Sequence, residues 1–257
     1  MLLAVDVGNT QTAVGLFLEG DLLTHWRLTS SVDQTTDELV VIYRALLENE
    51  GYRPDGVDGV AVSSVVPTLT SSYREMGKKL CGSETLVIDH ESVKNLKILY
   101  HDPQTVGADR LVNAIAARAK VGSPVIVVDL GTATTLDILD AEGSYAGGVI
   151  MPGVTTAANA LFSRGARLSK VEIVEPPRVV GRNTEESIQA GIFFGSAGAI
   201  DSLVDRVIAE MNFPKDIPVI ATGGLAGPLA HASRTITSVD DTLTLEGIRL
   251  VWEHSHS

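Results

Sequence analysis

Cysteine, aromatic side chains and long hydrophobic runs are all scarce in this sequence. Cys81 is the only cysteine, so no internal disulfide can form and a reducing cytoplasm is the expected location. No stretch approaches the roughly 20 apolar residues that a membrane-spanning helix needs, so no membrane attachment is expected. The first residues, Met1 to Val7, include Asp6 and no basic residue, which argues against a secretory signal peptide.

Positive charge is scarce as well. The chain has 20 Lys and Arg against 32 Asp and Glu, a net charge of −12, so nucleic acid is not an expected partner. An anionic substrate would therefore depend on local positive groups, namely helix N-termini, backbone N–H groups, metal ions or a few arginines.

The P-loop of many nucleotide-binding proteins is also missing. Its pattern requires a glycine, four further residues, then Gly-Lys followed by Ser or Thr. The only Gly-Lys pair, Gly77-Lys78, is followed by Lys79 and has Ser72 at the position of the first glycine. A nucleotide site in this chain must use another kind of loop.

What the sequence does contain is an internal duplication. An apolar run at 2–5 leads into Asp6-Val7-Gly8-Asn9-Thr10, and a second run at 125–128 leads into Asp129-Leu130-Gly131-Thr132. Each copy is followed by two more strand-like segments joined by a tight turn, at 12–18 and 22–28 in the first half and at 134–139 and 145–150 in the second.

Helical segments complete a βββαβα plan in each half. Thr35 and Glu38 form a capping box before the first helix. A fourth strand at 57–62 precedes a helix beginning near Pro67, and its counterpart at 218–221 precedes another short helix. We therefore expect an α/β fold of two domains, 1–122 and 123–257, whose mixed sheets face each other across a cleft.

A long helix is expected from Thr184 to Met211, with Asn183 and Glu186 as its capping box. Three glycines lie along one side of it. Because each glycine costs roughly 1 kcal/mol relative to alanine in a helix interior, close packing of another element of the chain is the expected compensation. These glycines are Gly191, Gly195 and Gly198. The last residues, 254–257, are expected to form a frayed polar tail.

The two Asp-x-Gly turns are candidates for phosphate binding. Gly8 permits a sharp turn, neighbouring N–H groups and the Thr10 hydroxyl can face phosphate oxygens, and Asp6 can hold a metal-bound water. A single Asp-x-Gly turn also occurs in ordinary hairpins, but two copies at the same point of a repeated unit favour two phosphate loops. Gly223-Gly224 would let a base or ribose approach the backbone, or would form a plain strand-to-helix turn.

A further candidate is the segment Val106-Gly107-Ala108-Asp109-Arg110, which opens a helix. An aspartate in a first turn is favourable for the helix dipole, whatever else it does. Near a phosphate site, Asp109 is also a candidate base that accepts the proton of an attacking hydroxyl, and Arg110 offers a fork for a carboxylate or phosphate. The segment 147–153 is a hairpin end that would also let backbone approach a substrate.

Together these motifs resemble the type III pantothenate kinases, within the acetate and sugar kinase, heat-shock chaperone and actin superfamily. The resemblance extends in order over nearly the whole chain and includes Tyr100 and Thr184 besides the motifs above. It implies duplicated ribonuclease H-like, actin-like ATPase domains with mixed five-stranded sheets facing a cleft. It also implies ATP-dependent phosphorylation of pantothenate to 4′-phosphopantothenate, the first step of coenzyme A biosynthesis, in a homodimer.

The same resemblance implies roles for individual residues and for cations. Asp109 matches the proton acceptor, Asp129 matches the ligand of a monovalent cation such as K⁺ or NH₄⁺, and Mg²⁺ accompanies the nucleotide. An alternative for Asp129 is that it repeats the role of Asp6 at a phosphate loop. The implied ATP contacts are Asp6, Val7, Gly8, Asn9, Thr10, Gln11, Thr12, Ala13 and Thr132, and the implied pantothenate contacts are Tyr100, Gly107, Ala108, Asp109, Arg110 and Thr184.

Two other functions stay open at this stage. One is a different kinase or a phosphohydrolase of the same superfamily, in which Tyr100 and Thr184 would line the pocket of another acceptor. The other is a nucleotide-sensing accessory protein that keeps the fold without catalysis. The intact Asp109 and both Asp-x-Gly loops favour the enzyme.

Overall fold

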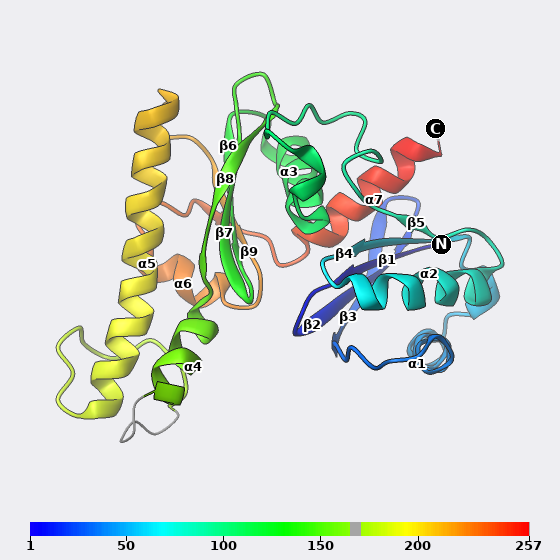
Figure 1. Ribbon diagram of the computed structural model, residues 1–257, viewed down its shortest axis with the longest axis horizontal. Coiled ribbons are helices and arrows are strands. Elements are labelled where there is room, and N and C mark those ends of the chain that lie inside the picture. The colour runs from blue at the N-terminus through cyan, green and yellow to red at the C-terminus, as the bar shows by residue number, and fades with distance from the viewer. Residues whose placement is uncertain (165–170, 257) are drawn as a thin grey trace. The chain divides into compact units, whose positions relative to one another are not determined.

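Two five-stranded sheets form the framework of the described chain, which comprises residues 1–164 and 171–256 of a computed structural model (Figure 1). The first sheet contains β1 (Leu2–Val7), β2 (Gln11–Leu18), β3 (Asp21–Thr29), β4 (Gly59–Ser64) and β5 (Leu86–Val87). The second contains β6 (Val125–Leu130), β7 (Ala133–Leu139), β8 (Tyr145–Pro152), β9 (Val219–Thr222) and β10 (Ser238–Val239).

The two sheets have the same topology. Their strand orders are β3-β2-β1-β4-β5 and β8-β7-β6-β9-β10. In each, the central strand pairs antiparallel with the strand that follows it and parallel with the fourth strand of its half. The predicted duplication and mixed sheets are therefore confirmed, and β1 and β6 are the equivalent central strands.

Seven α-helices are described: α1 (Thr36–Asn49), α2 (Pro67–Cys81), α3 (Ala108–Val121), α4 (Val154–Arg164), α5 (Thr184–Met211), α6 (Ala226–Ala232) and α7 (Leu243–Ser255). The predicted capping box of α1 is confirmed, since Thr35 and Glu38 bond reciprocally. At α5 the Asn183 side chain accepts from the Glu186 N–H at 2.8 Å. The Glu186 carboxylate accepts instead from the Arg182 N–H, one residue earlier than in a capping box.

The two halves bury separate cores. In the first, apolar side chains of β1, β2 and β4 pack with those of α1 and α2, around Tyr43 and Tyr73, whose rings meet edge to face. In the second, β6, β7 and β9 pack with α5 and α6 around Phe193 and Ile200. Alternation along each central strand leaves Asp6 and Asp129 on the opposite sheet face from these cores.

By its contacts the chain divides into two compact units, which we call unit 1 (Met1–Ala116 with Leu243–Ser257) and unit 2 (Ala117–Thr242). The expected domain division at 122 assigned α7 to the second domain. In the structure α7 contacts β1, β2 and β4 of the first sheet, on the face away from α1 and α2 (Figure 1). The chain thus returns to unit 1 at its end.

Two smaller expectations also differ from the structure. Residues 254 and 255 are helical rather than frayed, and the His256 ring stacks on Trp252 with 3.7 Å between ring centroids. Around Gly191, Gly195 and Gly198 a Cβ would meet no described atom within 4 Å, so the expected packing of another element is not found there. Among the described helices, none combines the length and hydrophobicity needed to cross a bilayer.

Candidate functional site

Asp6 lies at the carboxyl end of β1, in the middle of the first sheet. Its parallel neighbour in β4 is Ser63, whose hydroxyl donates to Asp6 Oδ1 at 2.9 Å. This bond holds the Asp6 carboxylate at the end of the strand. Ser63 was not among the residues predicted for the site, although the carboxyl ends of neighbouring parallel strands share one edge of a sheet.

The loop after Asp6 is a tight hairpin. The Gly8 N–H donates to the Gln11 carbonyl at 3.1 Å, and a Cβ at Gly8 would lie 2.8 Å from that oxygen, so only glycine fits. The side chains at the tip, Asn9, Thr10 and Gln11, are exposed. The tip can therefore present both side-chain and backbone donors to an anion.

Two predicted ATP contacts of this loop have buried side chains. Val7 and Thr12 are both 0% exposed. The Thr12 hydroxyl is hydrogen-bonded to Ser30 Oγ at 2.9 Å and accepts from the Tyr73 hydroxyl at 3.4 Å. These two residues can thus contact a phosphate through their backbone only, while Ala13 is half-buried on β2.

Asp109 stands in the first turn of α3. Its Oδ1 accepts from the Arg110 N–H at 2.8 Å. A Cβ at Gly107 would lie 2.5 Å from the same oxygen, so the glycine makes room for the carboxylate. Burial raises the pKa of Asp109, against the lowering effect of the Arg110 N–H and guanidinium. A carboxylate with a raised pKa is a stronger base than an ordinary one.

The other predicted substrate contacts of unit 1 surround Asp109 in sequence and differ in exposure. Ala108 and Arg110 are 7% exposed, Gly107 is half-buried, and Tyr100 is 36% exposed. A buried guanidinium near the start of a helix offers fixed donors for a carboxylate or phosphate group. Tyr100, on the segment before α3, offers a phenol that a bound molecule can reach.

In unit 2, Asp129 ends β6 as Asp6 ends β1. Its neighbours in register are Thr135 on β7 and Thr222 on β9. Gly223 has φ of +94°, and a Cβ there would lie 2.8 Å from Asp129 Oδ1 and from Leu130 backbone atoms. This glycine is therefore needed for the close approach of two chain segments, which accounts for it without a bound base or ribose.

The loop after Asp129, which contains Gly131 and Thr132, is held by hydrogen bonds from the start of α4. The Thr132 carbonyl accepts from the Gly153 N–H at 3.2 Å and from the Thr156 hydroxyl at 2.6 Å. A Cβ at Gly153 would lie 2.4 Å from the Gly131 and Thr132 carbonyl oxygens. The glycines of the 147–153 segment thus include one that holds the Thr132 loop in place. Thr132 itself is exposed.

Thr184, the remaining predicted contact, is the exposed first residue of α5. It follows the N-cap Asn183, so it lies where the backbone N–H groups of a helix start are found. Thr184 belongs to unit 2 with Asp129 and Thr132, whereas the 6–13 loop, Tyr100 and Asp109 belong to unit 1.

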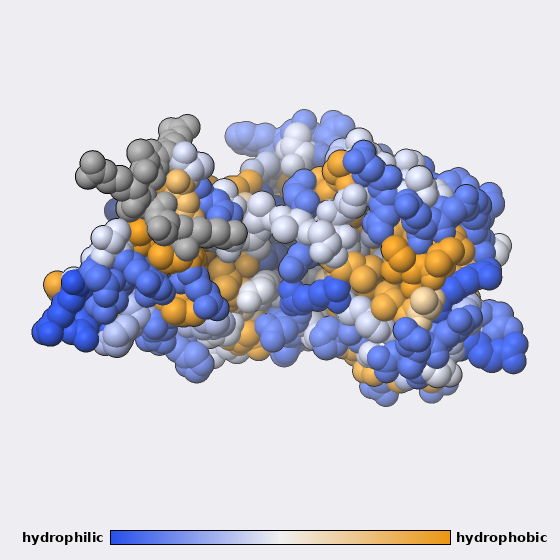
Figure 2. All heavy atoms as spheres, turned by 90° about the horizontal axis from the view of Figure 1, so that it is seen from below, coloured by the Kyte–Doolittle hydropathy of each residue, from blue (hydrophilic) through white to orange (hydrophobic). Residues whose placement is uncertain are grey.

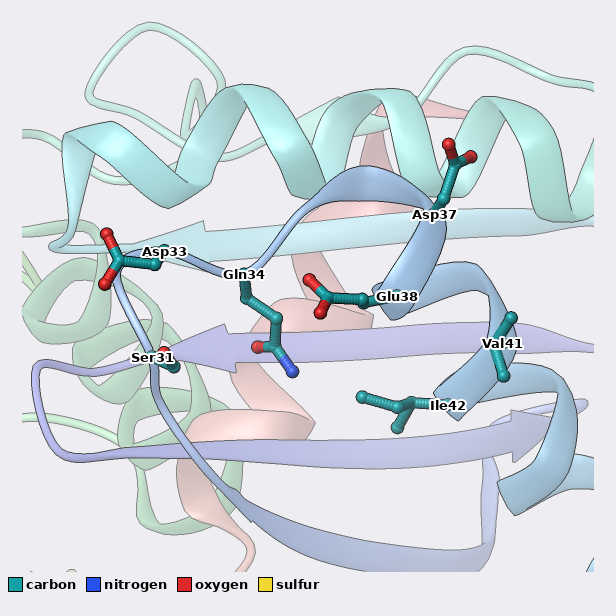
Figure 3. A pocket seen from close by; sticks show the side chains of 7 residues that line it. All are labelled: Ser31, Asp33, Gln34, Asp37, Glu38, Val41 and Ile42. Atoms are coloured by element: carbon teal, nitrogen blue, oxygen red, sulfur yellow. The ribbon is translucent and has the colours of Figure 1, made fainter.

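A cavity of about 600 Å³ at the start of α1 lies apart from these residues. Figure 3 shows its carboxylates, Asp33, Asp37 and Glu38, around the loop that leads into the helix. Asp37 is paired with Lys79 at 2.7 Å, and hydrogen bonds from Thr35 lower the pKa of Glu38. None of the predicted site residues lines this cavity, so we assign it no part in the candidate site.

The carboxylates of Asp6 and Asp129 suit cations whose other ligands come from a nucleotide. In the described part of the chain, no three His, Cys, Asp or Glu side chains gather into a metal cage. Mg²⁺ commonly binds through one or two carboxylates together with phosphates and water, which a single Asp6 can serve. Asp129, half-buried beside the turn at Gly131, offers a carboxylate and nearby carbonyl oxygens for a larger ion.

Comparisons with known proteins agree with one another. A family model described as type III pantothenate kinase matches residues 2–206. The type III pantothenate kinase of Myxococcus xanthus is 43% identical over 257 residues and covers all of both chains, and that of Moorella thermoacetica is 45% identical over 255 residues, covering 99% of this chain and 100% of its own.

A solved structure supports the fold. The activator of the 2-hydroxyisocaproyl-CoA dehydratase from Clostridium difficile, with bound ADPNP, has a TM-score of 0.58 at 14% identity and covers 99% of this chain and 97% of its own. At that identity only the architecture is shared, which is the duplicated actin-like ATPase fold. Because the family model and the full-length relatives coincide, the chain belongs to the type III pantothenate kinases, the ATP-dependent enzymes that phosphorylate pantothenate for coenzyme A biosynthesis.

Proposed function

We propose that this chain phosphorylates pantothenate with the 6–13 loop at the ATP phosphates and Asp109 as the base. The observation that carries the proposal is the state of Asp109: a half-buried carboxylate, fixed by the Arg110 N–H, with a raised pKa. Such a group accepts the proton of a primary hydroxyl as that hydroxyl attacks the γ-phosphorus. A fully solvated carboxylate would lack the raised pKa and would be a weaker base.

Most of the remaining catalysis is positioning and neutralisation of charge. The exposed hairpin tip 9–11 offers donors to phosphate oxygens, and Thr132 is the corresponding donor in the second loop. We assign Arg110 and Tyr100, with Gly107 and Ala108, to the pantothenate carboxylate and amide. All four assignments follow the family resemblance. Exposure supports the assignment of Tyr100, whereas Ala108 and Arg110 are buried.

Cations are the next part of the proposal. Asp6 would share Mg²⁺ with the nucleotide, and Asp129 would hold K⁺ or NH₄⁺. The supporting argument is electrostatic: ATP and pantothenate are anions, the chain has a net charge of −12, and no P-loop lysine is present. Bound cations neutralise phosphate charge. The Asp6 carboxylate is held by the Ser63 hydroxyl, and the Asp129 carboxylate lies close to the backbone at Gly223.

We also propose that the active form is a homodimer in which Thr184 of one subunit completes the pantothenate pocket of the other. Supporting observations come from unit 2 alone. A Cβ at any of the three glycines of α5 would meet no described atom within 4 Å. Large apolar side chains of unit 2 are exposed, and Figure 2 shows that apolar residues reach the surface among the polar ones. These side chains are Ile150, Leu161, Val174, Val179 and Val180. The cytoplasmic location stays a prediction.

The test is transfer of label from radioactive ATP to a panel of small hydroxy acids and amides, in sodium, potassium and ammonium salts at matched ionic strength. We expect label on pantothenate alone, and only with potassium or ammonium. Transfer to a different acceptor, or none to pantothenate, contradicts the proposed substrate. Equal rates in the three salts contradict the cation requirement, and an Asp129→Ala variant that still responds to potassium contradicts its assigned ligand.

A further inference from the structure

The last helix, α7, lies beyond residue 206, where the match to the family model ends. It touches two parts of unit 1 that carry proposed site residues, the first sheet and α3. We propose that α7 is the spacer that sets the position of Asp109 above the first sheet, with Gly247 and Thr244 as its positioning residues. The inference rests on the proposed role of Asp109 as the base.

One side of α7 is seated on the first sheet. Leu245, Ile248 and Val251 are each at most 3% exposed. Glycines in the strands allow this contact. A Cβ at Gly59 of β4 would lie 2.2 Å from the Trp252 ring, and one at Gly15 of β2 would lie 3.1 Å from Leu245. The helix therefore lies on the same sheet face as Asp6. The glycines of the strands let the helix approach the sheet closely.

Another side of α7 meets the backbone of α3. A Cβ at Gly247 would lie 2.1 Å from the Val112 carbonyl oxygen and 2.5 Å from its carbonyl carbon. No side-chain rotation can relieve such a contact, because the opposing atoms belong to the backbone. A glycine in the middle of a helix costs roughly 1 kcal/mol relative to alanine. Its presence here is explained by the close crossing of the two helices.

A buried polar contact sets the register of that crossing. The Thr244 hydroxyl donates to Asn113 Oδ1 at 2.8 Å, and Asn113 is 0% exposed. Asn113 is four residues after Asp109, so the two side chains lie one above the other on α3. The contact thus holds α3 one helical turn from the proposed base.

The consequence for Asp109 follows from the stiffness of a helix turn. A shift of α3 at Val112 or Asn113 is transmitted to Asp109 within the same two turns. A displacement of about 1 Å of a reacting group can lower turnover roughly 100-fold. Without the Thr244 hydrogen bond the two helices still pack together, but they can shift along each other. We therefore expect a smaller effect from loss of this bond than from a Cβ at Gly247.

The experiment measures kcat and KM of the full-length protein carrying Gly247→Ala or Thr244→Val. We expect kcat to fall roughly 100-fold in Gly247→Ala and roughly 10-fold in Thr244→Val. The KM of each variant should stay within about twofold of the wild-type value. Thr244→Ser, which keeps the hydroxyl, should restore kcat. Gly227→Ala is the matched control, because a Cβ in that helix meets no described atom within 4 Å, and it should keep wild-type kinetics.

A second measurement shows whether the effect passes through Asp109. In an Asp109→Asn background, neither α7 variant should lower the residual kcat further. An equal loss in both backgrounds overturns the proposal, as does wild-type kcat in Thr244→Val, which tests the idea even where Gly247→Ala fails to fold. Wild-type turnover of Asp109→Asn contradicts the proposed function itself. Low turnover of that variant with normal turnover of both α7 variants contradicts only the spacer.

Discussion

Asp109 is held where its negative charge is unfavourable. Burial raises the pKa of this carboxyl above the ordinary aspartate value, so the folded protein binds its proton more tightly than the unfolded chain does. The stability that Asp109 contributes is therefore present at acid pH and is lost as the pH rises through the folded pKa. In the proposed role as a base, Asp109 would give up stability for reactivity.

For Asp109→Asn we expect turnover to fall roughly 10²- to 10⁴-fold, since the proton acceptor is removed while the shape is kept. Pantothenate binding should survive. The variant should also be more stable than wild type in urea at pH about 8, with the difference shrinking toward pH about 4. Steady-state kinetics and urea titrations at the two pH values check both parts. Near-normal turnover would remove Asp109 from the mechanism.

The duplication offers a matched pair of buried threonines. Thr12 on β2 pairs with Val7, the residue after Asp6 on β1. Thr134 on β7 pairs with Leu130, the residue after Asp129 on β6. The Thr12 hydroxyl has Ser30 as a partner, whereas the buried Thr134 hydroxyl has none in the described residues. An unpartnered buried hydroxyl costs free energy that a methyl group does not.

We therefore expect Thr134→Val to raise the free energy of unfolding by about 1 kcal/mol and Thr12→Val to lower it by about 1 kcal/mol. The two substitutions have the same shape change, so each is the control for the other. Chemical denaturation with a common m-value is the measurement. Destabilisation of both variants by similar amounts would contradict the argument.

At the scale of elements, the Asp201 carboxylate of α5 is hydrogen-bonded to the segment that follows α6. Asp201 Oδ1 accepts from the Ser233 hydroxyl at 2.7 Å, the Thr235 hydroxyl at 2.8 Å and the Thr235 N–H at 3.1 Å. The Arg234 N–H donates to both oxygens at 3.1 Å. Burial alone would raise the pKa of Asp201, but these hydrogen bonds lower it overall.

Asp201→Asn should lower the free energy of unfolding by about 2–3 kcal/mol at neutral pH, because charged hydrogen bonds are lost and buried donors lose their partner. The stability due to a carboxyl with a depressed pKa is present above its unfolded pKa and is lost as the pH falls through the folded pKa. The difference between variant and wild type should therefore diminish in acid, as thermal unfolding over a pH series will show.

Asp205→Asn is the control on the same helix. Asp205 pairs with Arg234 at 2.7 Å, but the two side chains are 54% and 64% exposed, so the loss should be below about 1 kcal/mol. A loss for Asp205→Asn as large as that for Asp201→Asn would show that the buried hydrogen bonds are not what stabilises this part of unit 2.

At the scale of the whole molecule, the proposed homodimer predicts complementation between inactive subunits. Asp109→Asn removes the base, and Thr184→Trp blocks the part of the pocket that the partner contributes. A mixed dimer has one site with both parts intact, so mixing the two proteins should restore activity to a fraction of the wild-type value. Activity of the mixture and sedimentation of the wild-type protein are the measurements. A fully active monomer would contradict the dimer.

Much of this architecture could be predicted from local patterns. Strand alternation, the Thr35 capping box and the repeated Asp-x-Gly turns depend on neighbours in sequence, so they identify the strands, the start of α1 and the two loops. The end of the chain could not be predicted in this way. Its histidines and serines read as a tail, because nothing near them in sequence shows that Trp252 packs on Gly59 of a distant strand.

The sequence by itself determined the family, the duplicated α/β plan and the candidate residues, because those depend on residue types in a fixed order. Only the tertiary structure decided which candidates have accessible side chains: Thr12 is turned into the core while Thr10 at the hairpin tip is exposed. It also decided that Ser63 holds Asp6, that α7 packs on the first sheet, and that α7 contacts α3 at Gly247 and Thr244. These relations arise from strand register and from glycines that permit close backbone contact, which join residues far apart in the chain.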